Sequence, residues 1–216
     1  MRYLSTRDQE HTTSSFCDIL LEGLAPDGGL YLPEQYPTIG DAELNRWRDL
    51  LNEQGYAALA ADVLTLFIDD IPADDLKDII HRSYATFRAK DVTPVVTLDK
   101  SKNLHLMELF HGPTFAFKDV ALQFVGNLFE YFLVRMNKGK EGTDRQHLTV
   151  VGATSGDTGS AAIYGLRGKK DVSVFIMHPK GKVSPVQEAQ MTTVLDANVH
   201  NLAVDGTFDD CQVLML

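Results

Sequence analysis

The feature that most constrains the fold is an alternation of apolar, strand-like segments with helix-like segments in the second half of the chain. Short apolar runs at 148–151, 172–177 and 199–204 are separated by segments with helical patterning and capping signals. Strands that alternate with helices are joined by right-handed crossovers and form a parallel sheet. Ligands of such sheets bind outside the carboxyl ends of the strands. We therefore expect an α/β domain with its site beyond those strand ends.

The first ninety residues follow a different pattern and are predicted to be mostly helical. Ser15 and Asp18 have capping-box spacing, 25–29 is a proline- and glycine-containing turn, and 30–32 is a short strand. Helices are expected at about 41–52, 55–68 and 72–89. Thr93 precedes a proline and therefore avoids the helical region. The prediction is a helical N-terminal domain over 1–92 and an α/β domain over 93–216.

A long helix is predicted to begin near Lys118. Its apolar positions form one broad stripe, which is typical of core packing rather than of a cofactor site. The stripe comprises Ala121, Leu122, Val125, Phe129, Phe132, Leu133 and Met136.

Composition excludes several classes of function. The formal net charge is −10, and an acidic surface repels a nucleic-acid backbone. The two cysteines, Cys17 and Cys211, give no disulfide framework and no paired metal-ligand spacing, so no metal site is predicted. No apolar run reaches the roughly 18 residues of a membrane span, and the first residues lack a signal-peptide core. The expectation is a cytoplasmic protein that binds neither nucleic acid nor membrane.

The first segment with candidate catalytic residues is HGPTFAFKD at 111–119. Lys118 lies at a helix start, where the helix dipole disfavours a cation, and the neighbouring Phe115 and Phe117 could desolvate it. Both effects favour the neutral amine that condensation with an aldehyde requires. The competing interpretation is a solvated lysine that pairs with Asp119 or Glu108.

The second such segment is GATSGDTGS at 152–160, a glycine-rich turn between a strand and a helix. Backbone N–H groups of such a turn point at an anion, helped by the helix dipole. The hydroxyls of Thr154, Ser155 and Thr158 add donors. The segment lacks the lysine of a P-loop and the G-x-G-x-x-G spacing of a dinucleotide site. A simple capped turn is the plainer alternative.

Together these two segments resemble the threonine synthase family. HGPTFAFKD is similar to the family's cofactor-lysine motif, and TSGDTGSAA at 154–162 is similar to its substrate-side loop. YLSTR at 3–7, GLAPDGGL at 23–30 and QMTT at 190–193 also resemble family segments, in the same order. The resemblance extends over nearly the whole chain. The lysine motif and the S-G-D-T-G loop together make it quite specific.

The resemblance implies a fold-type II pyridoxal-phosphate enzyme of the tryptophan synthase β-like architecture. The implied reaction is a lyase reaction of threonine biosynthesis, which converts O-phospho-L-homoserine and water to L-threonine and phosphate. Lys118 would form the internal aldimine with pyridoxal 5'-phosphate and then move protons on the substrate. The loop from Ser155 to Gly159 would hold the substrate carboxylate and the ring side of the cofactor. The implied cofactor-binding set is Lys118, Phe117, Asn127, Ser155, Gly156, Asp157, Thr158 and Gly159.

One departure from the family pattern affects the expected activity. The family's second glycine-rich loop, of G-N-F-G type, binds the cofactor phosphate and does not occur here. The chain also stops about two turns into its last helix, which predicts that it is incomplete or is completed by a partner. We therefore expect the isolated chain to be inactive and to bind the cofactor weakly or not at all. The oligomeric state is left open.

Three alternatives remain open from the sequence. One is another fold-type II enzyme, such as a serine or threonine dehydratase. A second is a truncated or diverged threonine-synthase-like protein without catalysis. A third is an α/β domain that binds an anionic metabolite at 152–160.

Overall fold

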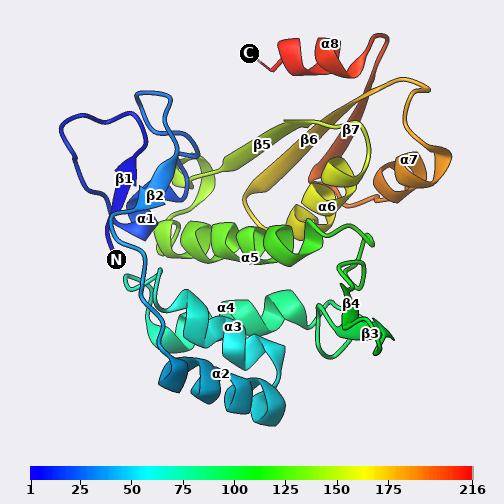
Figure 1. Cartoon of the computed structure of the whole chain (residues 1–216). Coiled ribbons are helices and arrows are strands. Elements are labelled where there is room, and N and C mark those ends of the chain that lie inside the picture. Colours follow the sequence, from blue (N-terminus) through cyan, green and yellow to red (C-terminus); the bar gives the residue numbers. More distant parts are fainter. Residues whose placement is uncertain (216) are drawn as a thin grey trace. The chain divides into compact units, whose positions relative to one another are not determined.

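The computed structural model describes residues 1–215 and divides into two compact units, Met1–His81 and Arg82 onward. Figure 1 shows the order of the helices and strands in each unit. Within the described residues, no helix is long and apolar enough to cross a membrane. The domain boundary that the sequence suggests, between residues 92 and 93, stays a proposal.

The first unit combines a two-stranded sheet with helices. Strands β1 (Tyr3–Ser5) and β2 (Tyr31–Pro33) are antiparallel, and helix α1 (Phe16–Ile19) lies between them in sequence. The predicted capping box of α1 is confirmed, because the Ser15 hydroxyl and the Asp18 carboxylate each bond the other residue's backbone N–H. The predicted turn is also present, closed by a bond of 2.8 Å from the Gly28 N–H to the Ala25 carbonyl.

The three predicted helices of this region are present with shifted ends. They are α2 (Asp41–Gln54), α3 (Tyr56–Leu64) and α4 (Ala73–Tyr84). Helix α3 stops before residue 68 because the chain turns tightly there, with bonds from Leu66 to Val63 and from Phe67 to Leu64. Helix α4 ends before residue 89. Its buried face carries Leu76, Ile79 and Ile80.

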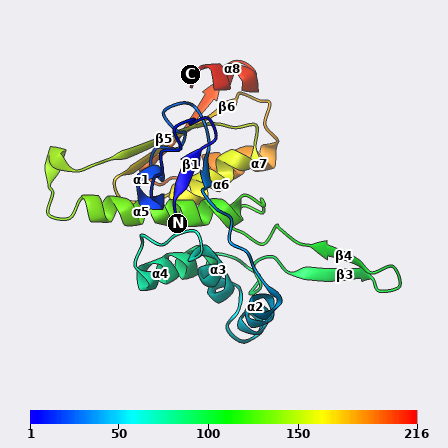
Figure 2. The same ribbon diagram turned by 60° about the vertical axis from the view of Figure 1, so that its left-hand side comes forward.

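The second unit contains a hairpin. Alternation of residues over 104–109 indicates strand β4 (Leu104–Met107), whereas no pattern marks its antiparallel partner β3 (Val95–Asp99). The register shifts between Thr97 and Asp99. Figure 2 shows the hairpin as a ribbon that extends away from the helices of its unit. All four residues of β4 are exposed, so burial gives this strand no alternating pattern.

A three-stranded parallel sheet forms the centre of the second unit, as predicted. Its order is β5 (Leu148–Ala153), β6 (Val172–Pro179) and β7 (Val199–Val204). Helix α6 (Asp157–Leu166) follows β5 and α7 (Pro185–Thr192) follows β6. Helix α8 (Phe208–Val213) follows β7, and a 3-10 turn η1 (Gly142–Asp144) precedes β5. Ser184 caps α7, which has Pro185 in its first turn, and Thr207 caps α8.

The core of the second unit lies on one face of this sheet. Val172, Val174 and Ile176 are at most 2% exposed and pack against α6 and α7. The helical side of this cluster comprises Leu133, Ile163, Leu166, Val183, Met191 and Val194. Val151 and Leu202 are about half exposed, so the sheet buries its two faces unequally.

Helix α5 (Asp119–Met136) is the scaffold helix that the sequence predicted, but its buried face is partly polar. Leu133 and Phe132 are buried as expected, whereas Ala121 and Met136 are exposed. The buried positions include Asp119, Gln123, Gly126 and Asn127. The predicted apolar stripe was therefore only partly correct. The reason is that α5 packs closely on α6: a Cβ at Gly126 would lie 1.9 Å from the Gly165 carbonyl oxygen.

Candidate functional site

Lys118 and the glycine turn come together at the carboxyl end of β5. Lys118 directly precedes α5, and Asp157 opens α6 after the turn. The Lys118 Nζ donates to a carboxylate oxygen of Asp157 at 2.8 Å, across 39 residues of sequence. The amine also lies 4.4 Å from the centroid of the Phe117 ring. The structure thus places the predicted amine at the predicted turn.

The surroundings of the amine differ from the sequence-based expectation. Phe115 and Phe117 are each 57% exposed, so they do not enclose the nitrogen. The ion pair with Asp157 and the face of the Phe117 ring both stabilise a cation. The expected partners are engaged elsewhere, since Glu108 contacts His111 at 2.7 Å and Asp119 binds Thr114. The neutral amine inferred from flanking rings is therefore not supported.

The hydrogen bond from Lys118 also affects the carboxyl group that receives it. This bond is the largest of the effects that hold the pKa of Asp157 below its ordinary value, and partial burial opposes it. Asp157 lies in the first turn of α6, where the helix dipole favours a negative charge. At neutral pH Asp157 is therefore a carboxylate, and it forms an ion pair with Lys118.

The lysine loop is held by a buried carboxylate. Asp119 is fully buried and accepts bonds from the Thr114 N–H at 2.8 Å and the Thr114 hydroxyl at 2.7 Å. Burial raises the pKa of Asp119, and the Thr114 bonds oppose that rise. Gly112 is required here, because a Cβ would lie 2.4 Å from this carboxylate. Phe115 has a φ of 63°, a backbone conformation that costs energy for a bulky residue. These contacts therefore fix the backbone conformation of the loop before Lys118.

The glycine turn is organised from within by Thr154. Its buried hydroxyl accepts bonds from the N–H groups of Gly156 at 3.0 Å and Gly159 at 2.9 Å. Thr154 was expected to offer its hydroxyl to a ligand, and this expectation is wrong because the hydroxyl faces inward. Ser155 and Thr158 are exposed and remain available to a ligand.

Helix α7 touches both segments, and its role was missed from the sequence. The Gln190 side-chain N–H donates to the Thr114 carbonyl at 3.0 Å. The Gln187 side-chain oxygen lies so close to Gly156 that a Cβ built on this glycine would be 2.4 Å from it. A signal was available, because two glutamines three residues apart on a capped helix share one face.

Asn127 does not join this cluster through any contact in the described part of the chain. It lies more than two turns along α5, and its side-chain nitrogen donates to Ser83 at 2.9 Å. Its side-chain oxygen accepts bonds from Lys169 at 2.6 Å and Arg82 at 3.2 Å. These bonds occupy Asn127 in a buried polar network. Its predicted contact with a cofactor stays a prediction without structural support.

An apolar cavity of about 460 Å³ adjoins the amine. Its lining comes from the start of α5 and from the first turn of α6, and comprises Phe117, Lys118, Val120, Ala121, Leu122 and Thr158. A flat, largely apolar ring with polar substituents suits such a wall, with the amine at its edge.

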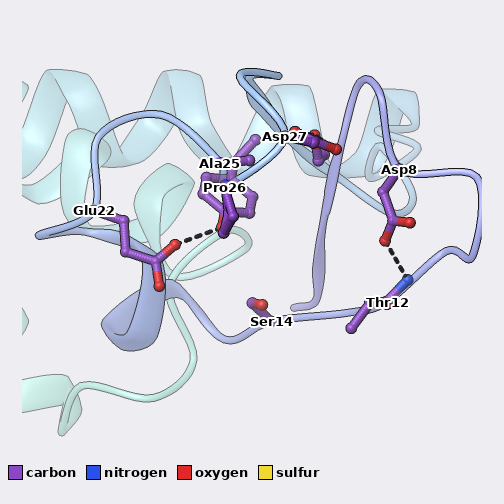
Figure 3. A pocket seen from close by; sticks show the side chains of 9 residues that line it. Asp8, Thr12, Ser14, Glu22, Ala25, Pro26 and Asp27 are labelled. Atoms are coloured by element: carbon purple, nitrogen blue, oxygen red, sulfur yellow. Dashed lines mark hydrogen bonds between the residues drawn. The ribbon is translucent and has the colours of Figure 1, made fainter.

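The first unit contains a different cavity, of about 370 Å³, drawn in Figure 3. It is lined by Ser5, Asp8, Thr12, Ser14, Glu22, Ala25, Pro26, Asp27 and Tyr31. Its three carboxylates already accept hydrogen bonds from neighbouring residues of the same unit. Asp8 accepts from the Thr12 N–H at 2.7 Å, Asp27 accepts from Ser5 at 2.7 Å, and Glu22 accepts from Tyr31. The lining carries no amine, so this cavity does not offer the chemistry of the Lys118 site.

These features define a class before any relative is considered. A lysine at the start of a scaffold helix faces a glycine turn at the carboxyl end of a parallel strand, in an α/β domain. Residues 2–84 match the family described as the threonine synthase N terminus. The chain is 58% identical to threonine synthase of Saccharomyces cerevisiae, over 97% of this chain and 41% of that protein. It is 56% identical to threonine synthase of Eremothecium gossypii over the same shares.

Solved structures agree with these sequence matches. The crystal structure of yeast threonine synthase superposes with a TM-score of 0.92 at 54% identity, over 99% of this chain and 42% of that one. A threonine synthase from Brucella melitensis, described as bound to PLP, gives a TM-score of 0.87 at 44% identity, over 100% and 43%. The chain belongs to the threonine synthase family and corresponds to the N-terminal part of its members. It spans about two fifths of the length of these relatives.

Proposed function

We propose that this chain supplies the lysine half of a pyridoxal-phosphate site in a threonine synthase, which converts O-phospho-L-homoserine and water to L-threonine and phosphate. The observation that carries the proposal is the 2.8 Å contact between the Lys118 amine and the S-G-D-T-G turn. The two motifs lie 39 residues apart in sequence. Their meeting matches the requirement for an amine that condenses with an aldehyde beside a set of anion donors.

The residues present fit such a cofactor. Lys118 offers an amine on a side chain that is 28% exposed and is therefore accessible from solvent. Ser155 and Thr158 offer exposed hydroxyls beside it, and the cavity next to Phe117 offers an apolar wall for a ring. When bound, pyridoxal phosphate supplies an electron sink for carbanions, which no protein side chain provides.

We assign separate roles to the residues of this half-site. Lys118 is the catalytic residue and moves protons at the substrate carbons through its Nζ. Ser155 and Thr158 bind the substrate carboxylate. Gly156 and Gly159 keep the turn narrow, and Phe117 borders the ring. Asp119 and Thr114 orient the lysine loop from behind.

The nearest competing enzyme is a serine or threonine dehydratase of the same fold. A chimera tests the two against each other: residues 1–216 of this chain joined to the remaining part of the yeast relative. The expected result is release of phosphate from O-phosphohomoserine, with an equal amount of threonine. Lys118→Ala in the same chimera should abolish it.

Two results would contradict the proposal. One is a folded chimera that releases keto acid from serine and no phosphate from O-phosphohomoserine. The other is phosphate release that survives Lys118→Ala. The Lys118→Arg variant keeps the positive charge and removes the reactive amine, so it should be as inactive as the alanine variant.

A further inference from the structure

The partner of Lys118 is a residue of the same turn that is proposed to receive anions. Within residues 1–215 the amine makes one ion pair, with Asp157 at 2.8 Å, and its other close neighbour is the Phe117 ring. The Lys118 side chain is 28% exposed and the Asp157 side chain 45% exposed. Both neighbours of the amine stabilise a cation.

An amine attacks an aldehyde carbon through its lone pair, which is not available while Nζ is engaged in this ion pair. We propose that Asp157 is a latch on Lys118: its carboxylate holds Nζ at 2.8 Å, directed at the turn, and this contact must break before Nζ can bond an aldehyde carbon. In the opening step the ion pair breaks and Nζ gives one proton to solvent. Nζ then forms a bond to the aldehyde carbon, and the aldehyde oxygen leaves as water with the two remaining amine protons.

The reaction also removes the cation with which Asp157 pairs. The bond from Lys118 is the largest effect that holds the pKa of Asp157 below its ordinary value, so consumption of the amine moves that pKa back toward its ordinary value.

The latch also assigns Asp157 a role different from that of its neighbours in the turn. A carboxylate beside Ser155 and Thr158 repels a substrate carboxylate and does not bind it. Asp157 is therefore a positioning residue for the amine, and the anion contacts fall to the two hydroxyls. The relevance of the latch to catalysis rests on the proposed function, but the ion pair does not.

Reductive labelling with a small neutral aldehyde tests the latch in the chain as it stands. Propionaldehyde and cyanoborohydride are applied to the wild type, Asp157→Asn and Asp157→Glu between about pH 7 and pH 8, and labelling of Lys118 is followed by peptide mass spectrometry. The exposed Lys140 and the Glu130-paired Lys169 serve as internal standards. Circular dichroism confirms that each variant is folded.

The expected result is about two- to five-fold faster labelling of Lys118 in Asp157→Asn, the factor that a partly exposed ion pair supplies. Asp157→Glu should restore the slow rate. In the wild type, raising the salt to about 1 M should also speed labelling, because it screens the pair without any substitution. Unchanged or slower labelling in Asp157→Asn, with both standards constant, would overturn the latch. Because propionaldehyde carries no phosphate or ring, the result stands or falls independently of the proposed function.

Discussion

The glycine turn depends on one buried hydroxyl. Thr154 is 2% exposed and satisfies two backbone N–H groups that would otherwise be buried without partners. Thr154→Val keeps the shape of the side chain and removes the acceptor. We expect a loss of about 1–3 kcal/mol in the free energy of unfolding, measured by urea titration.

Thr158→Val is the matched control for this substitution. Thr158 lies four residues away in the same segment and is exposed, so its replacement should change stability by no more than about 0.5 kcal/mol. Equal losses in the two variants would show that the Thr154 hydroxyl does not organise the turn.

Sequence patterns marked the candidate residues but not their partners. The motif around Lys118 and the turn around Asp157 could each be recognised from local spacing, since glycine, proline and caps act locally. The pairing of Lys118 with Asp157 rather than with Asp119 could not be predicted from local spacing. Asp119 is the nearer residue in sequence, but it points behind the loop toward Thr114, and only the folded backbone decides this.

Among the secondary-structure elements, helices α5 and α6 pack closely against each other at two glycines, Gly126 and Gly165. A Cβ at Gly126 would lie 1.9 Å from the Gly165 carbonyl, and one at Gly165 would lie 2.4 Å from the Leu122 carbonyl. Gly126→Ala should therefore destabilise by about 1–3 kcal/mol or more, which outweighs the roughly 1 kcal/mol that alanine adds to a helix.

Val134→Ala provides the comparison within the same helix. Val134 is 57% exposed, so the change should cost no more than about 0.5 kcal/mol. Both variants are compared by chemical unfolding followed through the far-ultraviolet circular dichroism. A Gly126→Ala protein as stable as the wild type would mean that the helices do not cross this closely.

Asp171 joins the end of α5, the loop after η1 and the start of β6. It accepts bonds from Arg145 and from the Asn137 amide, and the Arg145 bond is the main reason that its pKa lies below the ordinary value of 3.8. An acid with a lowered pKa in the folded state stabilises the protein above its ordinary pKa. That contribution is lost as the pH falls through the folded-state value.

Asp171→Asn should therefore be less stable than the wild type near pH 7, and the difference should shrink as the pH falls below about 3.8. Asparagine tolerates the φ of 61° at this position, so the variant isolates the charge. Urea unfolding at a series of pH values measures the difference. A gap that stays constant or widens on acidification would contradict the assignment.

Element positions were predictable where signals were strong and local. Strand β7 has the predicted bounds, because turn-forming residues mark its ends. Strand β3 was missed, since the exposed hairpin carries no buried face to impose alternation. The polar face of α5 was missed for a different reason: its partners are Ser83 and Lys169, which lie far away in sequence.

For the molecule as a whole, we expect affinity for the cofactor to be limited by the number of anion donors. The chain spans about two fifths of its relatives, and the second glycine-rich loop expected to bind the cofactor phosphate does not occur in it. We expect pyridoxal phosphate to be lost from residues 1–216 during dialysis. Retention of one equivalent per chain would show that this half-site is sufficient by itself.

The central claim is that the Lys118 amine is the cofactor-bearing group. Its most direct test is to add pyridoxal phosphate to the chimera with the yeast relative, reduce with borohydride before any separation step, and map the labelled lysine by mass spectrometry. We expect that Lys118 carries most of the label and that excess phosphate, a competitor for the anion donors, reduces it. Label spread evenly over the exposed lysines, or concentrated on a different one, would contradict it.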